Sequence, residues 1–260
     1  MHLIAVDVGN SRTKIGLFAP ASDRSTAPQA LQVETVDRGA DAPWSCFAQH
    51  LRGDRRVQGV IAATNPQQLA RLTESWPANW IQPLQHVERE RLPLRTTVHS
   101  PERVGIDRLL NAIAANHNRG ADQAVIVVDS GTATTIDVIG NSGEFQGGAI
   151  LPGLALSARA LHEYTALLPL VKFEQPSGSG EPPIVGRDTP SAIQSGLLWG
   201  HVGAIRELTS RYLANLPAPA DVLLTGGAAE LLHPQFPEFA LRPHLALEGL
   251  AIYACPPEAC

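Results

Sequence analysis

The sequence predicts a two-domain α/β protein that contains one duplicated domain. The main observation is a pattern that occurs twice. An apolar strand runs into Asp-x-Gly, a short polar turn and a second strand, at residues 7–14 (DVGNSRTK) and at residues 129–135 (DSGTATT). At an offset of 122 residues the aspartates and glycines align, and Thr13 meets Thr135. The length of 260 residues fits one large or two modest domains, and a hydrophobic content of 44% supplies a core.

The expected elements of the first half follow from its apolar patterning. Apolar runs between turn residues predict strands at residues 3–6, 15–18, 31–36, 57–62 and 80–83. Apolar side chains at helical spacing predict helices at 44–51, 66–76 and 106–117, with a helical turn at 100–101. Residues 20–28 and 89–99 have the composition of loops. The first two strands form a hairpin, and the third extends it in antiparallel fashion.

The second half repeats the hairpin and adds a long helix. Strands are expected at 124–128, 135–139, 144–150 and 222–224, and helices at 154–167, 190–213 and 245–254. Asp188-Thr189-Pro190 is a good start for the long helix, because a capping residue is followed by proline at the first helical position. That helix contains Gly196, Gly200 and Gly203 near one face, each costing about 1 kcal/mol relative to alanine. Close approach of another backbone, within the fold or at a dimer interface, would compensate this cost.

The two halves define two expected domains, residues 1–120 and residues 121–260, with the boundary near Gly120. Each domain has a mixed sheet that opens with a hairpin and is covered by helices. A ligand is expected between the domains at the strand ends.

Charge and composition exclude several classes of protein. The net charge of −5 and the lack of a basic stripe disfavour a nucleic-acid binder. No apolar run approaches the roughly 20 residues of a membrane span, and the N-terminal segment lacks the basic region of a signal peptide. Cys46, Cys255 and Cys260 show no metal-like spacing and are expected to be free thiols. We therefore expect a cytoplasmic protein with no membrane and no nucleic-acid partner.

The two Asp-x-Gly turns are candidate ligand sites. Glycine lets a ligand approach the backbone, and hydroxyl and amide groups donate to it. A carboxylate beside polyphosphate requires a cation between them, so Asp7 and Asp129 imply a bound metal, and Lys14 adds positive charge. One such turn would be read as an ordinary hairpin turn, but two at equivalent places of a repeat favour a site. The chain has no Walker P-loop, so any ATP would be bound by hairpins.

A third candidate is Gly105-Ile106-Asp107-Arg108, at the start of the helix 106–117. Asp107 is either a carboxylate favoured by the helix dipole or a base for a substrate hydroxyl. Arg108 would then bind a substrate carboxylate or the developing phosphoryl charge. Residues 175–183 (QPSGSGEPP) are either a flexible connector or a loop that closes over a substrate.

Five motifs in this order resemble a known family. They are DVGNSRTK (7–14), GIDR (105–108), DSGTATTIDV (129–138), GGAILPGL (147–154) and TALLP (165–169). Together they resemble the type III pantothenate kinases, relatives of the Bvg accessory factor. The resemblance implies the fold of the acetate and sugar kinase/heat-shock 70/actin superfamily, with duplicated ribonuclease-H-like domains. It also implies ATP-dependent phosphorylation of pantothenate, the first step of coenzyme A synthesis.

The resemblance implies a role for each matching residue. The first hairpin would bind ATP, with Mg²⁺ nearby, through Asp7, Val8, Gly9, Asn10, Ser11, Arg12, Thr13 and Lys14. Thr132 would contact ATP, and Asp129 would bind a monovalent cation, K⁺ or NH₄⁺. The pantothenate site would contain Gly105, Ile106, Asp107, Arg108 and Thr189, with Asp107 as the catalytic proton acceptor. The family is homodimeric and its pantothenate site uses the subunit interface, which would explain the glycines of the long helix.

The chain departs from the family pattern at two positions. Ser11 stands where threonine is usual and keeps the hydroxyl, whereas Val98 stands where a tyrosine is usual and removes one substrate contact. A non-catalytic accessory protein on the same fold, a kinase for another small substrate and a ribonuclease-H-like nuclease are the alternatives. The intact acidic positions disfavour the first, and the acidic net charge disfavours the last.

Overall fold

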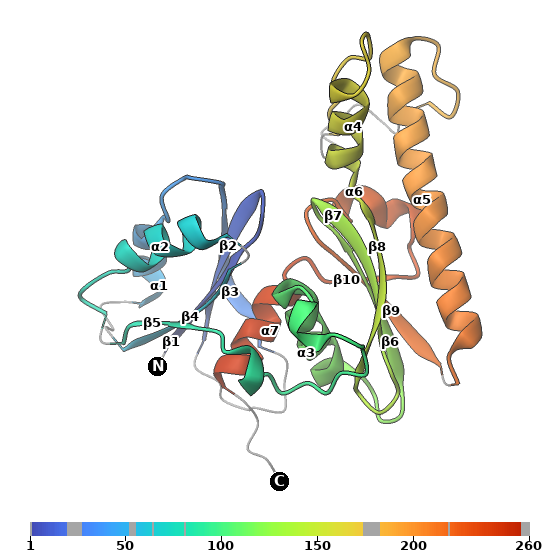
Figure 1. Cartoon of the computed structure of the whole chain (residues 1–260). Coiled ribbons are helices and arrows are strands. Elements are labelled where there is room, and N and C mark those ends of the chain that lie inside the picture. Colours follow the sequence, from blue (N-terminus) through green and yellow to red (C-terminus); the bar gives the residue numbers. More distant parts are fainter. Residues whose placement is uncertain are drawn as a thin grey trace. The chain divides into compact units, whose positions relative to one another are not determined.

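The computed structural model describes residues 2–19, 28–51, 56–63, 65–80, 82–173, 183–217 and 219–255. The chain divides into two compact units, residues 1–118 with 244–260 (unit 1) and residues 119–243 (unit 2). Each unit has its own five-stranded sheet (Figure 1). The expected loop at 175–183, except for Pro183, and most of the expected loop at 20–28 lie outside the described residues, as does Cys260.

The sheet of unit 1 has the strand order β3-β2-β1-β4-β5. Its strands are β1 (His2–Val8), β2 (Arg12–Phe18), β3 (Ala30–Asp37), β4 (Val57–Ala63) and β5 (Leu84–His86). The first three form an antiparallel meander, while β4 runs parallel to β1 and β5 runs parallel to β4. The predicted hairpin and the third antiparallel strand are confirmed.

The α-helices in the described part of unit 1 are α1 (Ala48–Leu51), α2 (Pro66–Glu74), α3 (Ile106–Asn118) and α7 (Leu245–Ala254). Helix α7 packs on α3 and β1 at such short range that a Cβ at Gly249 would lie 2.1 Å from the carbonyl oxygen of Leu110. This close crossing buries both apolar helices and draws the end of the chain into unit 1. The observed division therefore differs from the expected 121–260 domain at its C-terminal end, although it begins near Gly120 as expected.

The sheet of unit 2 repeats that of unit 1. Its strands are β6 (Ala124–Ser130), β7 (Ala133–Ile139), β8 (Phe145–Pro152), β9 (Ala220–Thr225) and β10 (Ala240–Leu241), in the order β10-β9-β6-β7-β8. Read from the opposite edge, this order and the strand directions match unit 1, since β6 to β8 form a meander and β9 is parallel to β6. The predicted duplication is confirmed by topology.

The two copies of the hairpin do not align at a single sequence offset. Strands β1 and β6 correspond at an offset of 122, with the same alternation of burial at their ends. Strands β2 and β7 share one burial pattern at an offset of 121, because the second turn is one residue shorter. The counterpart of Thr13 is therefore Thr134, which is equally buried, and the alignment of Thr13 with Thr135 is wrong.

Long helix α5 (Thr189–Asn215) packs against β6 and β7 of its own sheet. Apolar residues of its middle, Leu198, Val202 and Ile205, form a core with Ile126 and Val128 of β6. The first part of α5 lies beside α4 (Leu154–Glu163), around a separate small cluster (Figure 1). Helix α6 (Ala229–Leu232) completes unit 2.

The glycines of α5 lie on its exposed side. Within the described part of the chain, a Cβ at Gly196, Gly200 or Gly203 would meet no atom within 4 Å. A close approach of another backbone within the fold, one of the two expected explanations, is therefore wrong. The dimer interface stays a prediction.

Strand β5 and helix α4 differ from their predicted bounds, and two short elements were not predicted. The strand expected at 80–83 lies instead at β5, because Trp80 packs edge-on against Trp44 and Trp76 at ring distances of 6.0 and 4.6 Å. Helix α4 ends at Glu163 and not at residue 167, and the following segment is exposed. Strand β10 and helix α6 were not predicted, because two and four residues are too few to show a period.

The described residues contain no helix that is both long and apolar enough to cross a lipid bilayer.

Candidate active site

Hairpin 1, residues 7–14, presents opposite chemistry on its two faces. Asp7 and Lys14 are direct partners across the β1–β2 ladder, so their side chains lie on the same face. Val8 and Thr13, the next pair, point to the other face and are fully buried. A carboxylate and an ammonium group therefore share the first face, and any ligand contact from Val8 or Thr13 must come from the main chain.

The turn of hairpin 1 exposes its backbone. The Gly9 amide donates to the carbonyl oxygen of Arg12 at 3.0 Å, and Asn10 and Ser11 are exposed at the tip. The Arg12 side chain lies 3.7 Å from the carboxylate of Asp37 on β3, in an exposed ion pair of small energetic value. The turn is thus connected to β3 through Arg12, and Asn10 and Ser11 at its tip face solvent.

Hairpin 2, residues 129–135, has the same arrangement with a tighter turn. Asp129 and Thr135 are partners across the β6–β7 ladder, and the Gly131 amide donates to the carbonyl oxygen of Ala133 at 3.0 Å. The carbonyl oxygen of Thr132 accepts from the Gly153 amide at 3.1 Å, at the start of α4. The motif that ends in LPGL is therefore bonded directly to the turn that contains Thr132.

A second loop lies against Asp129, and it was assigned no role from the sequence. Strand β9 places Thr225 beside Asp129, and Gly226 follows with a positive φ of 98°. A Cβ at Gly226 would lie 2.4 Å from Oδ1 of Asp129, whereas Gly227 has nothing within 4 Å among the described residues. Gly226 is required by both backbone and space, and Gly227 leaves the main chain accessible. The only sequence signal was a strand that ends in Gly-Gly.

The donors around Asp129 suit a hard cation. Thr135 lies on the same face as Asp129, and its buried Oγ1 has no hydrogen-bond partner among the described residues. Thr225, the neighbour on β9, is also buried. Carboxylate and hydroxyl oxygens favour ions such as K⁺ over the soft metals that thiolate and imidazole select. No cluster of three His, Cys, Asp or Glu side chains with metal-binding geometry exists in the described ranges.

Helix α3 begins with the Gly-x-Asp-Arg motif. The half-buried Asp107 accepts a hydrogen bond from the Arg108 amide at 2.9 Å through Oδ1. A Cβ at Gly105 would lie 2.4 Å from the same oxygen, so glycine makes room for the carboxylate. Within the described part of the chain, no ion pair neutralises Asp107, and its charge is held only by main-chain donation.

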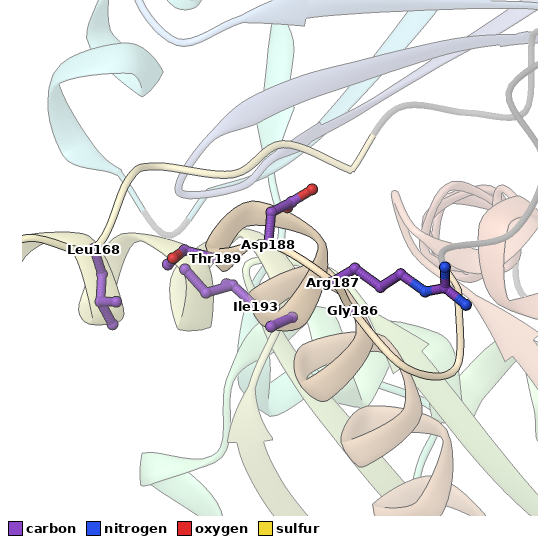
Figure 2. A pocket seen from close by; sticks show the side chains of 7 residues that line it. Leu168, Gly186, Arg187, Asp188, Thr189 and Ile193 are labelled. Carbon is purple, nitrogen blue, oxygen red and sulfur yellow. The ribbon is translucent and has the colours of Figure 1, made fainter.

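Thr189 lies at the first position of α5 beside an open pocket of about 580 Å³. Asp188 caps the helix, accepting from the Ser191 amide at 2.8 Å, and the amide and hydroxyl of Ser191 lower the pKa of this exposed carboxyl. Figure 2 shows Leu168 near Thr189, while the Arg187 side chain extends away from them. The lining of the pocket thus combines the Thr189 hydroxyl and the charged residues Arg187 and Asp188 with apolar side chains such as Leu168 and Ile193.

The candidate residues fall into two groups. Hairpin 1 and the start of α3 belong to unit 1, whereas hairpin 2, the Gly226 loop and Thr189 belong to unit 2. Val98, at the position where a tyrosine was noted as usual, is half-buried in the irregular segment before α3.

Comparison with known proteins gives one consistent result. The family model described as type III pantothenate kinase matches residues 3–211. A type III pantothenate kinase of Caulobacter vibrioides is 36% identical over 237 residues, covering 89% of this chain and 88% of the relative. One from Anaeromyxobacter sp. (strain K) is 34% identical, covering 96% and 97%.

Solved structures show the same fold at low identity. A conserved putative Baf family transcriptional activator from Campylobacter jejuni aligns with a TM-score of 0.57 at 18% identity, covering 97% of both chains. A putative 2-dehydro-3-deoxygalactonokinase from Sinorhizobium meliloti aligns with a TM-score of 0.52 at 13% identity, covering 97% and 98%. The predicted kinase-type α/β fold is therefore confirmed.

Proposed function

The chain belongs to the type III pantothenate kinase family, and we propose that it transfers the γ-phosphoryl group of ATP to the primary hydroxyl of pantothenate. The product is 4'-phosphopantothenate, and the reaction is the first step of coenzyme A biosynthesis. The observation that carries this proposal is the family match over residues 3–211, which contains hairpin 1, the Gly-x-Asp-Arg motif, hairpin 2 and Thr189.

Hairpin 1 binds the phosphates of ATP in this proposal. The exposed residues Asn10 and Ser11 of the turn donate to phosphate oxygens, and Lys14 supplies positive charge on the face it shares with Asp7. Asp7 holds the Mg²⁺ that accompanies ATP, directly or through water. When bound, that ion neutralises charge on the phosphates.

Hairpin 2 binds the nucleotide through Thr132 and a monovalent cation through Asp129. The unpaired Thr135 hydroxyl beside Asp129 supports an oxygen-lined site for K⁺ or NH₄⁺. The open main chain at Gly227 supports close approach of a ligand next to the same carboxylate.

Asp107 is the proposed catalytic residue. The pantothenate hydroxyl oxygen bonds to the γ-phosphorus, the bond between this phosphorus and the bridging oxygen of ADP breaks, and the hydroxyl proton passes to the Asp107 carboxylate. Because phosphoryl transfer has a loose transition state, proton transfer is late and Asp107 chiefly orients the hydroxyl. Gly105, Ile106 and Arg108 bind pantothenate beside it. Thr189 adds a hydroxyl from the start of α5.

The active protein is proposed to be a cytoplasmic homodimer. Large apolar side chains near α4 and the start of α5 are exposed, among them Tyr164 (86%), Leu167 (91%) and Ile184 (79%). Exposed apolar groups gathered in one region are typical of an interaction surface. The exposed glycine face of α5 continues next to it. Light scattering of Gly200→Glu tests this: the variant should be monomeric, and an unchanged dimer would exclude the glycine face from the interface.

The function is tested by coupled ADP release with a panel of pantothenate, acetate and sugars, in potassium or sodium salt. We expect turnover that requires pantothenate and is stimulated by potassium. Turnover with acetate or a sugar but not pantothenate would identify a different small-molecule kinase. No turnover with any substrate would favour the non-catalytic accessory role.

A further inference from the structure

Three buried polar side chains meet behind hairpin 2, on the face opposite Asp129. Nε2 of His201, on α5, lies 3.1 Å from the Thr134 hydroxyl and 3.4 Å from the Ser130 hydroxyl, and the two hydroxyls are 3.1 Å apart. All three residues are buried, Ser130 and Thr134 completely and His201 with 7% exposure. They interrupt a core that is otherwise apolar at this point, since Val202 and Val128 pack beside them.

The network connects a neutral imidazole to two hydroxyls. Burial lowers the pKa of His201, so the imidazole is uncharged at neutral pH. With its proton on Nδ1, Nε2 accepts from the Thr134 hydroxyl, which in turn accepts from Ser130. With the proton on Nε2, the imidazole donates to the hydroxyls. In both tautomers the hydroxyls have partners, which a buried polar group requires.

The network lies next to the proposed ligand residues in the chain. Ser130 directly follows Asp129, and Thr134 directly precedes Thr135. Successive side chains of a strand point to opposite faces, so one face carries Asp129 and Thr135 while the other carries Ser130 and Thr134. A hydrogen bond that fixes the second pair therefore also fixes the backbone from which the first pair extends.

Hairpin 1 shows that the fold does not need this network. The counterpart of Ser130 is Val8 and that of Thr134 is Thr13, and both are buried in the core of unit 1. The hairpin of unit 1 thus has a valine in an apolar cluster where hairpin 2 has Ser130. Polar groups in a core cost desolvation energy, and such groups are often retained for specificity of structure.

We propose that His201 is a positioning residue, which holds Ser130 and Thr134 so that hairpin 2 keeps the geometry for a monovalent cation at Asp129 and nucleotide at Thr132. This inference rests on the proposed function of hairpin 2. His201 contacts no ligand itself. Its effect should appear in the binding of ATP and potassium and much less in the chemical step, which is assigned to Asp107.

Three full-length variants test the proposal. His201→Leu removes the imidazole, His201→Gln keeps a polar group near the position of Nε2, and Thr209→Val is the matched control. Thr209 is buried on the same helix, and its hydroxyl has no hydrogen-bond partner among the described residues. Each variant is titrated calorimetrically with ATP in potassium and in sodium salt, and turnover is measured against potassium concentration.

For His201→Leu we expect the Kd of ATP in potassium and the potassium concentration for half-maximal turnover each to rise about tenfold, a change equivalent to about 1.4 kcal/mol. The kcat at saturating ATP and potassium should change by less than about twofold. His201→Gln should recover most of both losses, and Thr209→Val should match the unmodified protein. A purely structural role would lower the Tm and leave both binding constants unchanged, which would overturn the inference.

Two further outcomes are decisive. If His201→Leu does not fold, Thr134→Val removes the same hydrogen bond with little change of volume, and unchanged binding constants in it overturn the inference. If potassium does not alter the ATP affinity of the unmodified protein, the inference also falls. If potassium tightens ATP binding but pantothenate is not phosphorylated, the proposed function fails while the calorimetric test of His201 stands.

Discussion

Hairpin 1 and hairpin 2 are two copies of one structure with different chemistry. Both connect the first two strands of a sheet with the same strand order, and both place an aspartate at the end of the first strand. Across the ladder, however, hairpin 1 pairs its aspartate with Lys14, whereas hairpin 2 pairs it with Thr135. The first face therefore carries a charge pair, and the second carries only oxygen donors.

The strand that lies beside each aspartate also differs between the two sheets. Beside Asp7, strand β4 continues with Ala62 and Ala63, while beside Asp129, strand β9 ends at Thr225 and Gly226 follows it. The backbone of the duplicated domain thus supplies two equivalent positions, and a few side chains decide what each position binds. An ammonium group favours phosphate, and a ring of oxygens favours a cation.

The largest expected effect lies outside both hairpins. If the hairpins bind ligands and α3 carries the chemistry, Asp107→Asn should lower kcat by about 10² to 10⁴, because the hydroxyl loses its proton acceptor. Nucleotide affinity should be preserved, since neither hairpin is altered. Steady-state kinetics and calorimetric ATP titration check this. Near-normal turnover in the folded variant would end the assignment of Asp107 as the base.

The next effect concerns the loop that supports only hairpin 2. Gly226→Ala should lower the free energy of unfolding by about 3 kcal/mol, because the new Cβ would collide with Asp129 and Ser130 at a positive φ. Gly227→Ala is the matched control, since its Cβ meets nothing within 4 Å among the described residues. Urea denaturation compares them, and equal stabilities would contradict the close packing at Asp129.

A smaller difference in unfolding free energy is expected between variants of the buried threonines behind the two hairpins. Thr134→Val should cost about 1 to 2 kcal/mol of unfolding free energy, because Ser130 and His201 lose a buried partner. Thr13→Val, at the equivalent position of hairpin 1, should change stability by less than about 0.5 kcal/mol. The ladder partner of Thr13 is Val8, whereas that of Thr134 is Ser130. A similar loss in both variants would mean that the two hairpins do not differ behind their turns.

The smallest expected effect is the contribution of His201 to the pH dependence of the unfolding free energy. Since the folded pKa of His201 lies below its ordinary value of 6.5, the unfolded chain takes up this proton first as the pH falls. The contribution to stability is complete above pH 6.5 and is lost below it, toward the lowered folded pKa. His201→Gln should therefore lose less unfolding free energy than the unmodified protein between about pH 7.5 and about pH 5.5. Identical pH profiles would show that His201 does not titrate differently in the folded state.

Sequence patterning predicted the duplication and most elements, because long strands and helices repeat a period over many residues. It gave the wrong alignment between the second strands of the two hairpins. The turn of hairpin 2 is one residue shorter, so the counterpart of Thr13 is Thr134, and the motif alone does not show this. It included the returning C-terminal helix, α7, in the second domain, because apolar helices show that they are buried but not against which partner. The roles inferred for Asp7, Asp107 and Asp129 came from motifs and family resemblance.

His201 shows why parts of the candidate site could not be predicted from the sequence. A single histidine on a helix has no spacing signal, and its two hydroxyl partners lie about 70 positions earlier in the chain. The Gly226 loop is similar, because only β9 pairing with β6 brings it to Asp129. Contacts of this kind depend on how strands and helices pack and cannot be derived from local pattern.

The central proposal is that hairpin 1 holds Mg²⁺ with ATP and that hairpin 2 binds the monovalent cation. It is tested most directly by titrating a variant of each hairpin with both ions. Pantothenate-dependent turnover is measured against magnesium and against potassium for the unmodified protein, Asp7→Asn and Asp129→Asn. We expect Asp7→Asn to require at least about tenfold more magnesium with an unchanged response to potassium, and Asp129→Asn to lose potassium stimulation with an unchanged magnesium requirement. If both variants shift both responses equally, or if the two effects are exchanged, the hairpins do not divide the work as proposed.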